Sequence, residues 1–150
     1  MKTLIHAAGI GLLACAAAGT TYWIKGPPNR SVACDPALLK AGEVCLSRVI
    51  DDWQGKVIWV DARPRVDWQR DGVAGSVLWN LDETEDMQAF EAEAAVRMMD
   101  GQRVVVYCNN ENCGVSHQIA ERIRKLDLGN EVWVLFGGWR ALSAAKLTTR

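Results

Sequence analysis

The sequence predicts an α/β fold with an open, mainly parallel sheet of about four to five strands and helices on both faces. Three observations lead to this expectation. Apolar runs of strand length occur at residues 56–61, 103–108 and 131–135, and a strand buried on both faces reads as such a run. Segments with apolar residues at helical spacing separate these runs. Strand and helix therefore alternate, which favours right-handed crossovers between parallel strands.

The first half of the predicted domain is bounded by turn residues. Apolar side chains recur at helical spacing up to Trp53 and stop at Gly55. The apolar run after Gly55 ends on Asp61, and prolines, glycines and acids then indicate a loop. We expect, in order, a helix at 45–53, a strand at 56–61, a loop at 62–76 with a helical turn at 66–70, and a strand at 77–81.

The second half repeats the alternation. Met87, Phe90, Ala94 and Met98 form one apolar stripe in a segment that ends before a glycine. A later amphipathic segment ends at Gly129, a typical residue just past a helix C-terminus. We expect a helix at 82–99, a strand at 103–108, a helix at 116–128, a strand at 131–135 and a helix at 139–146.

The N-terminal segment differs from the rest of the chain. Residues 4–24 contain His6 as their only ionisable side chain. As a helix they would span about 31 Å, close to the thickness of a bilayer's hydrocarbon core. We therefore expect an N-terminal transmembrane or signal helix, with membrane contact through residues 4–24. Lys2 favours a cytoplasmic N-terminus, so the expected location is a bacterial inner membrane with the domain facing the periplasm.

Two alternatives to an uncleaved anchor stay open. The segment ending at Cys15, Leu-Leu-Ala-Cys, resembles a bacterial lipobox, which would make Cys15 a lipidated N-terminus. A cleaved signal peptide would give a secreted protein. The predicted organisation is an anchor or signal segment at 1–25, a linker at 26–45 and a single domain at 46–148.

Charge and cysteine spacing limit the classes of partner. The formal net charge is −1 and no Lys/Arg run occurs, which argues against nucleic acid. Cys34 and Cys45 form a disulfide if the domain is exported, and otherwise stay two free thiols. Paired short Cys-x-x-Cys spacing is absent from the sequence, so we expect no metal site. No cofactor is expected either.

The most informative feature is a strand that ends on Cys108 and is followed by a loop and a helix. Such a loop directs backbone N–H groups and the positive helix dipole at the cysteine, which lowers a thiol pKa and stabilises anions. Asp61 also ends a predicted strand. In open parallel sheets ligands bind outside the carboxyl ends of the strands. Asp61 and Cys108 are thus expected at one edge.

Four short pieces of the sequence together point to a known family. They are Val60-Asp61-Ala62-Arg63, Val73-Ala74-Gly75-Ser76, Val106-Tyr107-Cys108 and Val134-Leu135-Phe136-Gly137-Gly138-Trp139. Their order and spacing resemble those of the rhodanese-like domain family, and the resemblance covers residues 46–147. The first piece is similar to the family's strand-end Asp-x-Arg and the second to its Ile-Pro-Gly-Ala turn.

This resemblance implies a sulfurtransferase in which Cys108 takes up a sulfane sulfur as a persulfide. The implied substrate is a small sulfur-containing anion, or a thiol or persulfide of a partner protein. Asp61 and Arg63 would be the acid and base that brace the loop, although Arg63 could equally form a plain surface ion pair. The implied substrate-binding loop consists of Asn109, Asn110, Glu111, Asn112, Gly114 and Ser116.

The loop is atypical for that family. Cys113 stands where a cation is usual, Glu111 adds a negative charge, and Gly72 replaces a histidine of the family's turn. A second thiol at Cys113 could resolve an oxidised Cys108, which is the chemistry of a thiol-disulfide redox protein. Two different interpretations stay open as well: Cys113 as a small apolar side chain, and the whole domain as a non-catalytic binding module.

Two further residues near the loop have sequence-based expectations. Ser116 is expected to be the N-cap of the following helix. His117 could contact the loop or be solvated.

Overall fold

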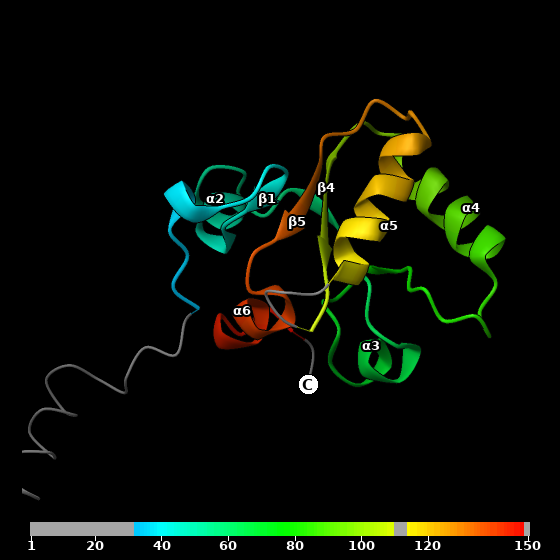
Figure 1. The fold of residues 1–150 in the computed structure, drawn as a ribbon, viewed down its shortest axis with the longest axis horizontal. Helices are drawn as coiled ribbons and strands as arrows, with labels where there is room; N and C mark the ends of the chain where they lie inside the picture. The colour runs from blue at the N-terminus through cyan, green and yellow to red at the C-terminus, as the bar shows by residue number, and fades with distance from the viewer. Residues whose placement is uncertain (1–31, 110–113, 149–150) are drawn as a thin grey trace, which may run out of the picture. The chain divides into compact units, whose positions relative to one another are not determined.

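The computed structural model describes residues 32–109 and 114–148. Within them, short helices and strands alternate along the chain (Figure 1). The elements are η1 (Pro36–Leu38), β1 (Glu43–Val44), α2 (Leu46–Asp51), β2 (Val57–Asp61), α3 (Arg65–Asp71), β3 (Val77–Leu78), α4 (Met87–Met98), β4 (Arg103–Tyr107), α5 (Gly114–Lys125), β5 (Val132–Leu135) and α6 (Gly138–Ala144).

The strands form one sheet in the order β1-β5-β4-β2-β3, and every neighbouring pair is parallel. This confirms the predicted α/β class, with a sheet of five strands. The longest pairing joins β2 to β4, from Val57 opposite Arg103 to Asp61 opposite Tyr107. The carboxyl ends of β2 and β4 therefore lie side by side at one edge.

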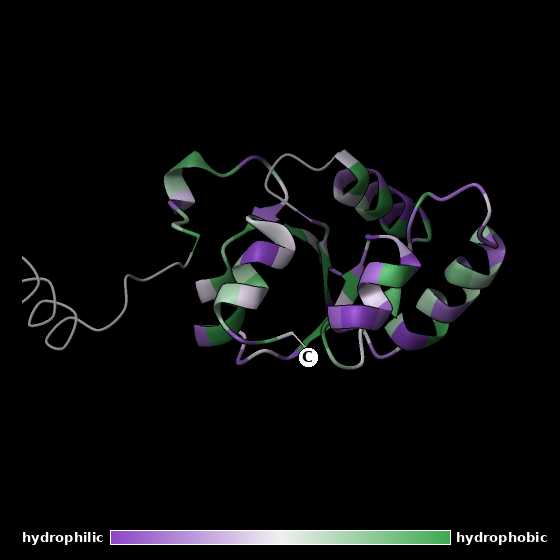
Figure 2. Cartoon of the chain, turned by 90° about the horizontal axis from the view of Figure 1, so that it is seen from below, coloured by the Kyte–Doolittle hydropathy of each residue, from purple (hydrophilic) through white to green (hydrophobic). Residues whose placement is uncertain are grey.

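Strand residues alternate between two hydrophobic clusters on opposite faces of the sheet. In Figure 1, α4 and α5 lie on one side of β4, and α2 and α6 on the other. Figure 2 shows largely hydrophobic strands and helices that mix hydrophobic with hydrophilic residues. The first cluster includes Ile58, Val60, Val104, Val106, Phe90 and Ile119. The second includes Val105, Tyr107, Leu135, Val49 and Leu142.

The predicted linker at 26–45 contains part of the domain. Glu43 and Val44 form the edge strand β1, which pairs with Val134 and Leu135 of β5. The main-chain N–H of Phe136 donates to the carbonyl of Val44, extending this pairing. The folded domain thus begins before the predicted boundary at residue 46.

Helix boundaries differ from expectation where a side chain decides them. The Asp86 carboxylate accepts from the N–H groups of Gln88 and Ala89, so α4 begins at Met87 rather than at residue 82. The prediction that Ser116 caps its helix was wrong, because α5 already begins at Gly114.

A disulfide joins Cys34 to Cys45 and closes the segment that contains η1 and β1. In residues 32–109 and 114–148, every helix falls short of the length and apolarity needed to cross a bilayer. The predicted membrane segment at 4–24 and the lipidation candidate Cys15 lie outside the described residues.

Candidate active site

Cys108 is the first residue after β4 and lies at the carboxyl edge of the sheet. Its side chain belongs to the hydrophobic cluster on the α4 and α5 face, and only 2% of the residue is exposed. Its Sγ lies 3.5 Å from the hydroxyl oxygen of Ser116, which is buried in the first turn of α5. The sulfur therefore lies beside the N-terminal turn of a helix of 12 residues.

The backbone around Cys108 is held from a second side. The main-chain N–H of Trp139, in the first turn of α6, donates to the Cys108 carbonyl at 2.6 Å. Cys108 itself is disulfide-bonded. Chemistry by a Cys108 thiolate would thus require reduction of this disulfide first.

Asp61 and Arg63 form a buried ion pair, not the surface pair that the sequence left open for Arg63. Asp61 is fully buried and Arg63 is 1% exposed. The guanidinium donates to Asp61 through Nε and Nη2, the latter at 2.8 Å from Oδ2. Its Nη1 donates to Asp71 Oδ1, also at 2.8 Å. Burial lowers the pKa of Arg63, but the hydrogen bonds to both carboxylates outweigh burial and raise it.

Tyr107 extends this network to the strand that ends on the cysteine. Its hydroxyl donates to Asp61 Oδ2 at 2.7 Å and accepts from the N–H of Val73 at 3.0 Å. Burial, followed by the charge of Asp61, raises the pKa of Tyr107 well above its ordinary value. The hydroxyl therefore stays protonated and works as a fixed donor to the carboxylate.

Gly72 fits closely against the network. A Cβ at this position would meet the Trp68 carbonyl oxygen at 2.7 Å and Asp61 Oδ2 at 3.4 Å. The site therefore has no room for a larger side chain at the place where the rhodanese-like pattern has a histidine.

The network and the sulfur lie on opposite faces of the sheet. Tyr107 packs in the cluster under α2 and α6, whereas Cys108 packs in the cluster under α4 and α5. Asp61 and Arg63 therefore brace the strand ends from the far face. The ring of Trp139 lies 5.3 Å from the Arg63 guanidinium, and its indole N–H donates to the Asp71 carbonyl. One tryptophan thus contacts both the network and the Cys108 backbone.

Several predicted site residues fall where the structure gives no description. Asn110, Glu111, Asn112 and Cys113 lie outside the described residues. Among the other loop residues, Asn109 is exposed and Gly114 begins α5.

Sequence reasoning missed four residues that shape the site: Glu43, Asp71, Tyr107 and Trp139. Tyr107 and Trp139 stand within two of the matched sequence pieces, but the sequence assigned none of the four a role, because their contacts form only when the chain folds. Glu43, for example, is hydrogen-bonded to His117, 74 positions away. The sequence therefore offered no local signal for this contact.

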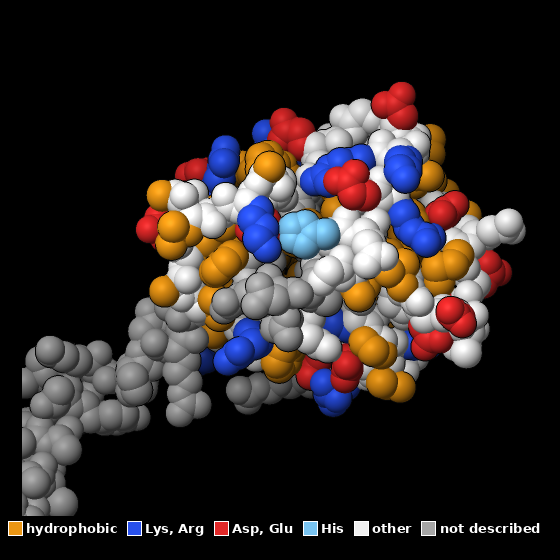
Figure 3. Space-filling view, in the orientation of Figure 1, with side chains coloured by type: hydrophobic (Ala, Val, Ile, Leu, Met, Phe, Trp, Pro, Cys, Tyr) orange, Lys and Arg blue, Asp and Glu red, His pale blue; other side chains and the backbone are white. Residues whose placement is uncertain are grey.

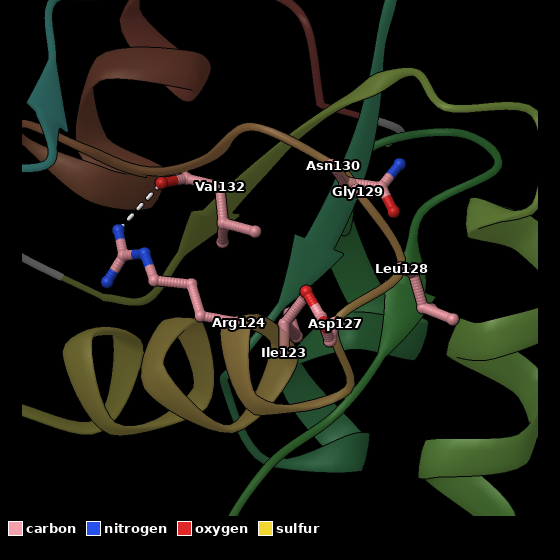
Figure 4. A pocket seen from close by; sticks show the side chains of 7 residues that line it. All are labelled: Ile123, Arg124, Asp127, Leu128, Gly129, Asn130 and Val132. Atoms are coloured by element: carbon pink, nitrogen blue, oxygen red, sulfur yellow. Dashed lines mark hydrogen bonds between the residues drawn. The ribbon is translucent and has the colours of Figure 1, made fainter.

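Two hollows on the described surface can be assigned lining residues, and Cys108 is not among those residues. One, of about 100 Å³, lies between the end of α5 and the start of β5, where Arg124 donates to the Val132 carbonyl (Figure 4). Another, of about 310 Å³, is lined by Trp68, Gln69 and residues 72–76. The described residues contain no group of three or more His, Cys, Asp or Glu side chains that could hold a metal ion. On the face in Figure 3, acidic and basic side chains are interspersed.

A family model for the rhodanese-like domain matches residues 48–145. The chain belongs to the rhodanese-like domain family. The match covers β2 to β5 and includes Asp61, Arg63 and Cys108. No curated protein matches this rhodanese-like chain.

Solved structures share the fold of this rhodanese-like domain. A rhodanese-related protein from Thermoplasma volcanium has a TM-score of 0.52 at 13% identity, covering 71% of this chain and 96% of that one. A thiosulfate sulfurtransferase from Pseudomonas aeruginosa has 0.51 at 19%, covering 79% and 21%. A 3-mercaptopyruvate sulfurtransferase from Leishmania major has 0.51 at 16%, covering 72% and 36%. The chain thus spans a minor part of both sulfurtransferases, and the likeness is one of fold.

Proposed function

We propose that this protein is a persulfide-forming sulfurtransferase with Cys108 as its nucleophile. The supporting observation is the position of the Cys108 sulfur at the end of a central parallel strand, 3.5 Å from a hydroxyl in the first turn of α5. Helix N-termini stabilise negative charge, which both a thiolate and a sulfur-containing anion carry. Membership of the rhodanese-like family and the two sulfurtransferases of similar fold support the same chemistry.

The proposed reaction has two displacement steps at sulfur. The Cys108 thiolate attacks the outer sulfur of a donor such as thiosulfate, a new S–S bond forms, and sulfite leaves with the electrons of the broken bond. A nucleophilic acceptor, either cyanide or a thiol, then attacks the outer sulfur of the persulfide. The Cys108 thiolate leaves and is regenerated. The buried Asp61, Arg63 and Tyr107 network keeps the end of β4 in place throughout.

The test is a thiocyanate assay on the full chain in detergent, after reduction and removal of the reductant. Thiosulfate and cyanide should yield thiocyanate, and Cys108→Ala should lose this activity. Cys15→Ser serves as the control, because it removes another cysteine and keeps Cys108 and the Cys34–Cys45 pair. Unchanged turnover in Cys108→Ala would show that another group carries the chemistry. Absence of turnover in the unsubstituted chain would instead favour a binding module.

A second candidate function is thiol-disulfide exchange, and the disulfide state of Cys108 favours it. In this candidate function Cys113 is the resolving thiol: its thiolate attacks Cys108 within a mixed disulfide, and the reduced partner leaves. Peptide-resolved mass spectrometry after mild oxidation, in a Cys34→Ser, Cys45→Ser background, should find Cys108 linked to Cys113. Free thiols at both positions would rule out this candidate.

Tethering of the domain in the periplasm through residues 4–24 completes the proposal. The disulfide between Cys34 and Cys45 supports it, because such bonds persist in oxidising compartments. Intact-mass measurement of the membrane fraction separates the possible forms. An unprocessed chain indicates an anchor, a chain that starts at a lipidated Cys15 indicates a lipoprotein, and a soluble, shortened chain indicates a cleaved signal.

A further inference from the structure

Glu43 is a buried acidic residue on the edge strand that the proposed reaction does not use. Glu43 is 7% exposed, although β1 is an edge strand of the sheet. One carboxylate oxygen accepts from the main-chain N–H of Lys40 at 2.9 Å. The other lies 3.1 Å from Nε2 of His117, in the first turns of α5. The carboxylate therefore ties the edge strand to the helix whose N-terminus lies beside Cys108.

Two lines of contact lead to Cys108 from residues 32–45, the segment that contains the disulfide. The first runs from Glu43 to His117, whose neighbour Ser116 has its hydroxyl 3.5 Å from the sulfur. The second runs through Gly137, where a Cβ would meet Val32 at 2.8 Å, so these two residues are in tight contact. Gly137 is the N-cap of α6, the helix whose first turn donates to the Cys108 carbonyl.

Each half-cystine lies close in sequence to one of these two contacts. Val32 stands two residues before Cys34, and Glu43 stands two residues before Cys45. Cys45 is itself buried and follows β1 directly. Because β1 consists of two residues, its pairing with β5 gives it little stability of its own. The covalent link therefore holds both contacts in position.

We propose that Glu43 is a positioning residue for Cys108, acting through His117, and that the Cys34–Cys45 disulfide keeps Glu43 in place. The reactivity of Cys108 then depends on the redox state of a second cysteine pair. This inference rests on the proposed nucleophilic role of Cys108.

The redox step is an ordinary exchange with a dithiol. One thiolate of the dithiol attacks Cys34 or Cys45, and the other sulfur of the pair leaves as a thiolate. The second thiol of the reagent then closes on the first, which releases the protein as two thiols and the reagent as a cyclic disulfide. The edge strand loses its covalent link, the Glu43 contact weakens, and the first turn of α5 is no longer fixed over the sulfur.

The test measures the rate of Cys108 alkylation by iodoacetamide against pH, in the full chain with Cys15→Ser and Cys113→Ser. In this background the remaining disulfide is the Cys34–Cys45 pair. The midpoint of the pH profile reports thiolate formation, whereas the plateau also reports access. The charged groups on the elements around the carboxyl edge include Glu43 on β1, His117 on α5, Arg140 on α6, and Asp61, Arg63 and Asp71 in the buried network. Serine substitution of the cysteine pair leaves all of them in place.

With the disulfide intact, Cys108 should alkylate about tenfold faster at neutral pH than after Cys34→Ser and Cys45→Ser, because its profile midpoint is about one unit lower. Reduction of the pair by dithiothreitol should give the same slow rate. Circular dichroism confirms that both forms are folded. A midpoint that is low and equal in all forms overturns this inference alone.

Glu43 is tested with the disulfide present, and circular dichroism checks that each variant is folded. Glu43→Ala should slow Cys108 alkylation, while Glu43→Gln, which keeps an acceptor for His117, should restore most of the rate. Glu131→Gln is the control, because it removes an exposed ion pair with Arg103 at the start of β4. Equal rates in Glu43→Ala and the control overturn the proposal. If Cys108 reacts no faster in any folded form than it does in the urea-unfolded chain, the proposed function is overturned as well.

Discussion

Replacement of Arg63 by methionine should destabilise the domain severely. The substitution keeps most of the apolar stem and removes the charge, leaving the fully buried Asp61 carboxylate without its cation. Removing one partner of a buried pair costs about 3–5 kcal/mol. Two donors to Asp61 survive, the main-chain N–H at position 63 and the hydroxyl of Tyr107. They place the expected loss near the lower limit, at about 3 kcal/mol.

Urea unfolding followed by far-UV circular dichroism measures this loss as a shift in midpoint at constant slope. The melting temperature should fall by about 12 °C, from about 4 °C per kcal/mol for a domain of roughly 115 residues. Arg65→Met is the matched control, because Arg65 pairs with Glu85 but is 45% exposed. Exposed pairs contribute about 0–1 kcal/mol. Equal losses for the two substitutions would refute the bracing role of the buried network.

Three further outcomes are expected from the same unfolding assay. Tyr107→Phe removes the hydroxyl that donates to Asp61 and should cost about 1–3 kcal/mol. The pKa of Tyr107 is raised in the folded state, so the stability that its hydroxyl contributes is present below about pH 10 and lost as the pH rises through the folded-state pKa. Tyr107→Phe should not show this loss of stability at alkaline pH. Burial raises the pKa of Asp71, but the hydrogen bonds from Arg63 and Arg70 outweigh burial and lower it. The stability that Asp71 contributes is therefore present above about pH 4 and lost as the pH falls further. Asp71→Asn should reduce this loss of stability at acid pH. Cys34→Ser with Cys45→Ser removes a disulfide between residues 11 positions apart and should cost about 3 kcal/mol of stability. The variant should be as stable as the unsubstituted chain in which this disulfide has been reduced.

The central part of the fold follows from local sequence pattern. Runs such as residues 56–61 and 103–108 are apolar because both faces of their strands are covered, and such runs identify parallel strands directly. The edge strand β1 escaped prediction because two residues have no period. The order of strands in the sheet was also inaccessible, since it depends on pairings between distant segments.

The candidate site was predictable in its positions and not in its contacts. A cysteine and an acid at strand ends pointed to one edge, and the register of Asp61 opposite Tyr107 places them there. The exact end of the strand decides which face of the sheet each side chain lies on. The apolar run at residues 103–108 does not define that end. The N-cap prediction for Ser116 failed for a similar reason: glycine at 114 tolerates the start of a helix, and the turn began two residues earlier.

Tyr107 and Cys108 are neighbours in the chain, but their side chains lie on opposite faces of the sheet. Tyr107 belongs to the buried network with Asp61 and Arg63, whereas Cys108 packs in the cluster under α4 and α5. A single peptide bond joins the two residues. We therefore expect changes in the loop directly after Cys108 to leave the hydrogen bonds among Asp61, Arg63 and Tyr107 in place. A scaffold divided in this way can exchange its reactive loop for another while its folding stability is preserved. This separation makes the domain a suitable host for grafting loops of different length and charge onto one unchanged sheet.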